Sequence, residues 1–268
     1  MMNEYYLPAG NTYYRTNEFK HGRPTLVFVH GLSGSSSAWA EYERFFSEKC
    51  NVLSYDLRGH GKSPKPKRYK DYAMEHLVED LHELLAHLKI EKCIIVSHSF
   101  AVLIVLEFLA RYQSQVSAVV FLSPSFCVRD MFSSRIAEPF LQLSRLMEPL
   151  PFSGKPGAHV DYTRFKNTGD WNIPRMIADV GNTSIRVYLW GSLQTYSVDR
   201  EAFLSEIEIP VLLMHGKNDT IFPVKNSLIM AQQIKNSKLI LLDNMDHIMV
   251  LNRFPEVSVA IEKFVNSL

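Results

Sequence analysis

The sequence predicts an α/β protein with a mostly parallel, doubly wound sheet and an inserted helical cap. Three observations support this class. Short apolar runs without alternation recur along the chain, as expected for strands that are buried on both faces. Stretches with apolar residues at helical spacing separate most of these runs, which is typical of βαβ units. Late in the chain, residues 127–200 interrupt this alternation with helical patterns alone.

The predicted elements follow from these periodicities. Two Tyr-rich runs, 4–7 and 12–16, surround a turn at 8–11 and indicate an opening hairpin. The predicted strands after it are 25–29, 51–55, 94–96, 116–122, 210–214 and 238–242. The predicted helices are 38–49, 72–89, the run that begins at Phe100, 133–147, 173–180, 184–196 and 255–265. The expected domains are an α/β core of residues 1–126 and 201–268 and a helical cap insertion of residues 127–200.

Composition narrows the possible functions. The chain has 268 residues, of which 46% are hydrophobic, and this suits one large domain with an insertion. Its formal net charge of +1 indicates neither nucleic acid nor an anionic membrane as a partner. The apolar run 100–110 is too short to span a bilayer and contains Glu107, so we expect no integral membrane association. The three widely spaced cysteines and the absence of a visible signal sequence predict a cytoplasmic protein.

Ser99 lies at the centre of a predicted strand-to-helix turn. The apolar run 94–96 enters the turn, and the longer run that begins at Phe100 leaves it. Ser97 and Ala101 flank Ser99 at two residues' distance and are small, as a nucleophile on such a turn requires, because the two backbones nearly touch there. Most serines in such turns have no catalytic role, so the rest of the chain must decide between the two interpretations.

Polar residues also follow two later predicted strands. Asp219 comes after 210–214, and His247 comes after 238–242. Because functional residues gather at the carboxyl ends of strands in a doubly wound sheet, we expect Ser99, Asp219 and His247 to meet. Acyl transfer needs this set, since histidine can take the serine proton near neutral pH and a carboxylate fixes the imidazole tautomer.

The developing oxyanion needs two N–H donors. The residue after the proposed nucleophile, Phe100, can supply one of them. The loop after the strand 25–29 can supply the other, at Leu32.

At these positions the chain resembles the α/β-hydrolase superfamily, in the group with a helical cap between the sixth and seventh strands. The resemblance covers nearly the whole chain. The residues that carry it are His30-Gly31, Asp56-x-Arg58-Gly59-His60-Gly61-x-Ser63, the turn around Ser99, Gly216-x-x-Asp219 and Asp246-His247. It implies Ser99 as nucleophile, Asp219 as acid and His247 as base. Ser97 and Ala101 stand where the family usually has glycine, and a serine at position 99 disfavours the branches with an aspartate nucleophile.

Other residues compete for these roles or suggest other chemistry. Asp246 and Asp243 are alternatives to Asp219, but Asp246 adjoins His247, and neighbouring side chains rarely face each other. His98 is expected to point away from Ser99 into the fold. The pair of histidines at 82 and 87 is one residue too far apart for a zinc motif, so we expect no metal site. The glycine-punctuated loop 59–63 lacks the earlier glycine of a phosphate-binding loop, so we expect no cofactor.

The predicted substrate pocket is apolar. Large side chains of the inserted segment, together with one residue after His247, are expected to line it: Phe140, Met176, Tyr188, Trp190 and Ile248. No basic cluster is placed by the sequence to hold a carboxylate or a phosphate.

The sequence therefore predicts a serine hydrolase that cleaves a carboxylic ester of a small to medium, largely apolar molecule through an acyl-enzyme. Its expected partner is that small-molecule substrate. Lactone, thioester or carbon–carbon bond hydrolysis and acyl transfer stay open on the same residues, as does a receptor-like ligand-binding protein of the same fold. The sequence does not indicate the oligomeric state.

Overall fold

The computed structural model describes residues 2–10, 12–128 and 132–268, and for residues 132–135 it describes the backbone alone. Asn11 of the predicted opening turn and residues 129–131 of the predicted insertion lie outside this part of the chain. The described strands form one sheet in the order β1-β2-β4-β3-β5-β6-β7-β8. Their bounds are β1 (Asn3–Tyr6), β2 (Tyr13–Thr16), β3 (Thr25–Val29), β4 (Asn51–Tyr55), β5 (Cys93–His98), β6 (Val116–Leu122), β7 (Val211–Gly216) and β8 (Ser237–Leu242).

The sheet confirms the predicted fold class. β1 and β2 form the opening hairpin, and β2 pairs antiparallel with β4. The other five pairings, from β4 across to β8, are parallel. The carboxyl ends of β3 to β8 therefore lie along one edge of the sheet, where the loops that follow these strands meet.

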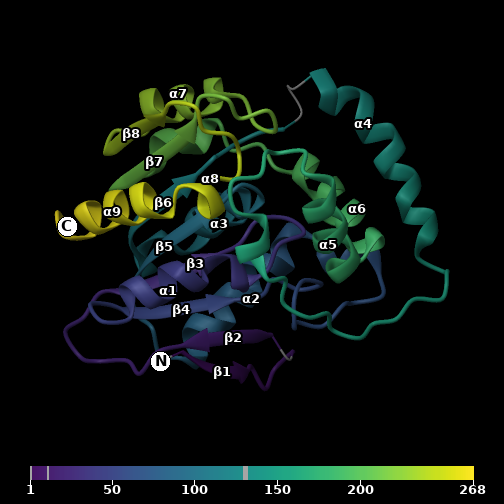
Figure 1. The fold of residues 1–268 in the computed structure, drawn as a ribbon, viewed down its shortest axis with the longest axis horizontal. Coiled ribbons are helices and arrows are strands. Elements are labelled where there is room, and N and C mark those ends of the chain that lie inside the picture. Colours follow the sequence, from purple (N-terminus) through teal and green to yellow (C-terminus); the bar gives the residue numbers. More distant parts are fainter. Residues whose placement is uncertain (1, 11, 129–131) are drawn as a thin grey trace.

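Helices cover both faces of the sheet. Their bounds are α1 (Ala40–Phe46), α2 (Met74–His87), α3 (Phe100–Tyr112), α7 (Val224–Gln233), α8 (Met249–Asn252) and α9 (Phe254–Val265). Alternate residues of β3 enter two halves of the core: Val27 and Val29 join the half that contains α2 and α3, whereas Leu26 and Phe28 join the half that contains α1 and α9. Figure 1 shows α1 and α9 together on one side of the sheet. Burial on both faces explains why β3 lacks an alternating pattern.

The sequence analysis assigns no element to the residues of α7. The buried residues of this helix are Asn226, Ser227 and Met230. Ser227 hydrogen-bonds the His215 imidazole at 2.6 Å, and the Asn226 amide donates to the Ser125 hydroxyl at 2.9 Å. Because two of the three buried side chains are polar, α7 has no apolar stripe for a periodicity argument to detect.

The described part of the segment between β6 and β7 contains the α-helices α4 (Phe132–Leu143), α5 (Ile173–Thr183) and α6 (Ile185–Gln194). Figure 1 shows them set apart from the sheet, with α4 outermost. A backbone bridge joins Cys127 to Asp199, and the Arg200 N–H donates to the Phe126 carbonyl at 3.1 Å, so the two ends of the segment lie side by side. The cap boundaries at 127 and 200 stay a prediction, which these contacts support. None of the described helices is both long and apolar enough to cross a membrane.

Candidate active site

Ser99 lies between β5 and α3 in a strained backbone conformation. Its φ and ψ are 56° and −121°, in a region that L-amino acids seldom occupy. Its N–H donates to the Leu122 carbonyl at 3.0 Å, and its own carbonyl accepts from Val102 at 2.9 Å. Ser97 and Ala101 are fully buried, so small side chains at both flanks let β5 and α3 approach closely. The turn thereby presents the Ser99 hydroxyl at the carboxyl edge of the sheet.

His247 links Ser99 to Asp219. It lies in the loop after β8, with its Nε2 atom 2.7 Å from the Ser99 hydroxyl and its Nδ1 atom 2.8 Å from Asp219 Oδ2. A carboxylate can only accept, so Nδ1 donates to Asp219, and Nε2 is left to accept from the serine. The structure thus brings together the three residues that the sequence places at separate strand ends.

Asp219 is held by several donors. Its Oδ1 atom accepts the N–H groups of Ile221 at 2.9 Å and Phe222 at 2.8 Å, and His215 Nε2 lies 3.1 Å from Oδ2. Burial acts to raise the pKa of this carboxyl, but the hydrogen bonds from His215 and His247, the charge of His247 and the Phe222 N–H outweigh burial and hold the pKa well below its usual value. Asp219 is therefore ionised at neutral pH.

His98, predicted to point away from Ser99 into the fold, contacts the backbone of His247, which the sequence analysis did not anticipate. Its Nε2 atom lies 2.9 Å from the His247 carbonyl, and the Ser123 hydroxyl donates to the same oxygen at 3.2 Å. Burial, with a smaller contribution from the charge of His247, lowers the pKa of His98 to about 3. A neutral His98 therefore donates a hydrogen bond to the His247 carbonyl and helps to hold this part of the backbone in place.

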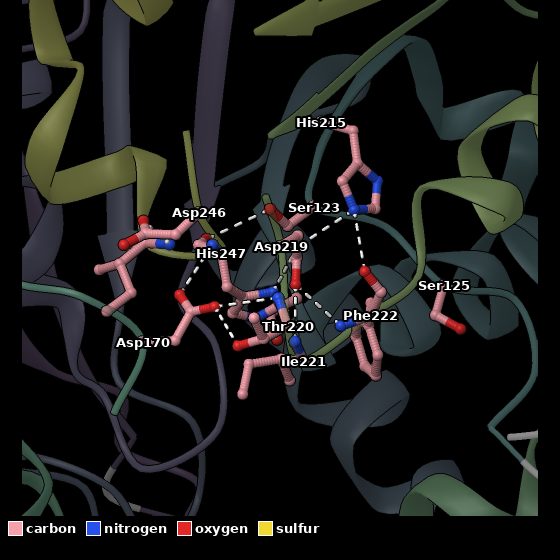
Figure 2. Close-up of polar contacts among 12 residues, drawn as sticks. Ser123, Ser125, Asp170, His215, Asp219, Thr220, Ile221, Phe222, Asp246 and His247 are labelled. Atoms are coloured by element: carbon pink, nitrogen blue, oxygen red, sulfur yellow. Dashed lines mark hydrogen bonds and ion pairs between the residues drawn. The ribbon is translucent and has the colours of Figure 1, made fainter. Parts of the chain in front are cut away.

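Asp170, which the sequence analysis does not single out, also contacts this backbone. It lies in the loop before α5 and is 8% exposed. One of its oxygens accepts the His247 N–H at 2.8 Å, and the other accepts the Thr220 N–H and hydroxyl at 3.0 and 2.6 Å. Figure 2 shows this carboxylate between the loop that carries Asp219 and the loop that carries His247. A lone aspartate in a loop of the inserted segment carries no sequence signal for such a contact.

The two alternative acids make other contacts. Asp246 Oδ1 accepts the Ile248 N–H at 3.1 Å, as a turn residue does. Burial raises the pKa of Asp246, opposed in part by the Ile248 N–H. Asp243 is paired with Lys217 at 2.7 Å on the surface. The imidazole of His247 hydrogen-bonds Asp219 instead, as expected.

A cavity of about 720 Å³ opens above Ser99 and His247. Its size is typical of small-molecule sites. Four of the five residues predicted to line a pocket face it, namely Phe140, Met176, Tyr188 and Ile248, and so do both predicted oxyanion residues, Leu32 and Phe100. Phe140 stands at the rim, since 71% of its surface is exposed.

Trp190 is the wrong prediction among the pocket residues. It is fully buried, its Nε1 donates to the Ser144 carbonyl at 3.0 Å, and its ring packs edge-on against Tyr69 and Tyr72. Trp190 follows Tyr188 by two positions, which turns its side chain by about 200° around a helix with 3.6 residues per turn. Since Tyr188 faces the cavity, Trp190 faces the core instead.

The inserted segment also places polar groups in the cavity wall. Asp179 accepts the Tyr162 hydroxyl at 2.8 Å and lies 3.3 Å from Arg175 Nη1. Arg175 Nη2 donates to the Asp170 carbonyl at 2.7 Å. Burial raises the pKa of Asp179 to about 6, against the opposing effects of Tyr162 and Arg175. The guanidinium is thus engaged by neighbouring residues on both Nη atoms.

The loop after β3 passes directly beside Ser99. A Cβ atom placed on Gly31 would lie 3.3 Å from the Ser99 Cβ and 3.2 Å from the His98 ring, so only glycine allows this approach without displacement. Phe100 begins α3, and the first N–H groups of a helix have no partner within it. Leu32, in the loop that passes Ser99, and Phe100, the residue after Ser99, both line the cavity. Among the described residues, no three His, Cys, Asp or Glu side chains are grouped to hold a metal ion.

Comparison with known proteins agrees with the fold. Residues 24–254 match the family model described as alpha/beta hydrolase fold. RutD of Pseudomonas savastanoi pv. phaseolicola, which its name proposes to be a carbamate hydrolase, is 31% identical over 242 residues, which is 84% of this chain and 86% of RutD. Human protein ABHD8 is 26% identical over 257 residues, which is 90% of this chain and 54% of ABHD8.

Solved structures show the same fold. The enol-lactonase from Burkholderia xenovorans LB400 has a TM-score of 0.75 and 23% identity, over 98% of this chain and 100% of that one. The 2-hydroxy-6-oxo-6-phenylhexa-2,4-dienoate hydrolase from Rhodococcus sp. strain RHA1 has a TM-score of 0.75 and 19% identity, over 99% of each chain. At these identities the similarity is one of fold.

Proposed function

Because this chain belongs to the alpha/beta hydrolase fold family, we propose that it is a serine hydrolase that cleaves carboxylic esters of small to medium, largely apolar molecules. The observation that carries the proposal is the continuous hydrogen-bond chain from the Ser99 hydroxyl through His247 to Asp219. A nucleophile, a base and a group that orients the base are the parts that acyl transfer requires.

The proposed reaction follows from these contacts. Ser99 Oγ attacks the ester carbonyl while His247 Nε2 takes the hydroxyl proton, and the imidazolium is stabilised by the ionised Asp219. The N–H groups of Leu32 and Phe100 stabilise the oxyanion of the tetrahedral intermediate. His247 then gives the proton to the leaving alcohol, and an acyl-enzyme on Ser99 is left. Water, activated by His247, hydrolyses it and returns the serine.

The cavity supports a largely apolar substrate. Phe140, Met176 and Ile248 supply apolar surface to its wall. Arg175, a cation in the wall, already contacts the Asp179 carboxylate and the Asp170 carbonyl, and both aspartates also line the cavity. A substrate carboxylate would have to compete with these groups, so a neutral ligand is favoured.

Other carbonyl substrates stay possible on the same residues. The proposed carbamate hydrolysis of RutD and the lactonase activity named for the Burkholderia structure make carbamates and lactones the first alternatives to esters. Thioester or carbon–carbon bond hydrolysis and acyl transfer would use the same nucleophile. A receptor-like protein of the same fold would keep the cavity without rapid turnover.

The test combines a fluorophosphonate probe with a substrate panel. The panel holds p-nitrophenyl esters of graded acyl length, a lactone, a thioester and a carbamate. We expect stoichiometric labelling of the wild type, no labelling of Ser99→Ala, and the highest kcat/KM on an ester. Turnover retained by Ser99→Ala would contradict the proposed nucleophile. Labelling without turnover of any panel member would favour the receptor-like alternative.

A further inference from the structure

We propose that Asp170 is a positioning residue, through which the inserted helical segment sets the geometry of Ser99, His247 and Asp219. The proposal rests on the function proposed above. Asp170 touches none of the three reactive side chains in the hydrogen bonds of the described residues. It acts instead on the backbone that carries two of them.

Both oxygens of Asp170 are used by the two loops. Oδ1 accepts the N–H of His247 itself, at 2.8 Å. Oδ2 accepts the N–H and the hydroxyl of Thr220, the residue that follows Asp219, at 3.0 and 2.6 Å. Figure 2 shows the carboxylate bridging these groups from the side opposite His215. One side chain therefore connects the loop of the acid to the loop of the base.

Neighbouring contacts hold Asp170 in this place. Arg175 Nη2 donates to its carbonyl at 2.7 Å, and the Trp171 indole N–H donates to the Thr220 hydroxyl at 3.0 Å. The hydroxyl of Thr220 consequently accepts from Trp171 while it donates to Asp170. The bridge thus has a fixed hydrogen-bond direction at every member. Asp170 and His247 are buried, whereas Thr220 and Trp171 are exposed.

Loss of the bridge should misalign the reactive groups. A carboxylate forms stronger hydrogen bonds to backbone N–H groups than a neutral acceptor does. Without it, the N–H groups of His247 and Thr220 lose a buried acceptor, and both loops can shift to recover one. A displacement of about 1 Å in a catalytic group can cost roughly 10²-fold in rate. Asp170 also lines the cavity, but substrate affinity depends mainly on the apolar side chains of the wall, which Asp170→Ala leaves in place.

The chain offers a matched control at Asn252. Asn252 also ties the inserted segment to the core, because its Oδ1 accepts the Asn167 N–H and its Nδ2 donates to the Thr168 carbonyl, both at 2.8 Å. These bonds lie close to Asp170 along the chain but contact neither Thr220 nor His247. Asn252→Ala therefore loosens the segment without removing the bridge.

The experiment compares Asp170→Ala, Asp170→Asn and Asn252→Ala in the full chain. Ester turnover gives kcat and KM, and proton NMR at low temperature detects the low-field proton between His247 Nδ1 and Asp219. We expect Asp170→Ala to lower kcat about 10- to 100-fold with KM changed less than threefold, and to shift or broaden the low-field proton. Asp170→Asn keeps one acceptor and should lie between Asp170→Ala and the wild type. In Asn252→Ala, both kcat and the low-field proton should stay near their wild-type values.

Two outcomes would overturn the proposal. One is a folded Asp170→Ala, or a folded Asp170→Asn if the alanine variant does not fold, with wild-type kcat and an unchanged low-field proton. The other is an equal loss of kcat in Asn252→Ala, since attachment of the segment would then be sufficient. Failure of the proposed function is distinguishable from both, because it would show as turnover retained by Ser99→Ala, whereas the NMR signal reports the alignment of His247 without turnover.

Discussion

The loops at the strand ends and the helical segment above them form the walls of the same cavity, but their residues are placed by different means. Ser99, Asp219 and His247 each follow a strand of one parallel sheet, so strand pairing fixes their relative positions. The residues of the segment reach the cavity through side-chain contacts with the core. Asp170, for instance, meets Thr220 and His247 across 50 and 77 positions of sequence. The strand-end loops should therefore supply the reacting groups, whereas the segment should select the substrate and, through Asp170, align those groups.

The largest effect is expected at the nucleophile. Ser99→Ala should lower kcat on a p-nitrophenyl ester by about 10⁶-fold, as loss of a serine nucleophile does in another hydrolase. The substitution removes only a hydroxyl, so the circular dichroism spectrum and the melting temperature should change little. Activity of Ser99→Ala within tenfold of wild type would break the assignment of the reaction to the strand ends.

A smaller loss is expected at the acid. Asp219→Asn should lower kcat by about 10⁴-fold, because an amide cannot stabilise the His247 imidazolium and favours the wrong tautomer. Asp246→Asn is the matched control, since it alters a carboxylate one residue from His247 that bonds the Ile248 N–H. It should retain most of the activity. The reverse ranking of the two variants would show that Asp246 is the acid.

The two regions should also respond to pH in opposite directions. Burial, with the charge of His30, lowers the pKa of His60 in the core to about 3, below the value of 6.5 expected when unfolded. His60 therefore contributes stability that is present above pH 6.5 and is lost as pH falls toward 3. The pKa of Asp179 is raised to about 6 from 3.8, so its contribution is present below pH 3.8 and is lost as pH rises through 6.

Urea unfolding between pH 4.5 and 7.5 can test this difference. Between pH 4.5 and 7, the wild type should lose on the order of 1–3 kcal/mol of its free energy of unfolding through Asp179. Asp179→Asn should not show this loss. His60→Asn, whose amide can still donate to the Arg58 carbonyl, should flatten the decline toward pH 4.5. If Asp179→Asn kept the wild-type pH dependence, the carboxyl would not be titrating in this range.

The smallest effect is expected at the cavity rim. Phe140→Ala should change the preference between adjacent acyl lengths by about 1 kcal/mol, or roughly fivefold, because a methylene that enters an apolar wall contributes about 0.8 kcal/mol. Leu146→Ala is the matched control, since Leu146 is equally exposed, at 72% against 71%, but does not line the cavity. The rate of fluorophosphonate labelling should be nearly unchanged in both. An equal shift of preference in both variants would mean that the rim does not select the acyl chain.

The contrast between the regions also explains which features could be predicted from the sequence. Strand positions were predictable because burial on both faces leaves continuous apolar runs. The proposed reactive residues could be placed near one another because each lies in a loop after such a run. Trp190 was misassigned because position along a helix sets the direction of a side chain, and two residues reverse it. Asp170 was missed because its role depends on folded contacts with distant residues. A helix that buries polar side chains, such as α7, escapes a periodicity argument for the same kind of reason.

The backbone conformation of Ser99 affects the melting temperature of the protein. A non-glycine residue in such a region costs on the order of 1–3 kcal/mol, whereas glycine adopts it with ease. Ser99→Gly should therefore melt at a higher temperature than Ser99→Ala, although both lack the nucleophile. The difference is reduced by the greater freedom of glycine in the unfolded chain, about 0.5–1 kcal/mol. Heat resistance in this protein is thus limited in part by the residue on which its proposed chemistry depends.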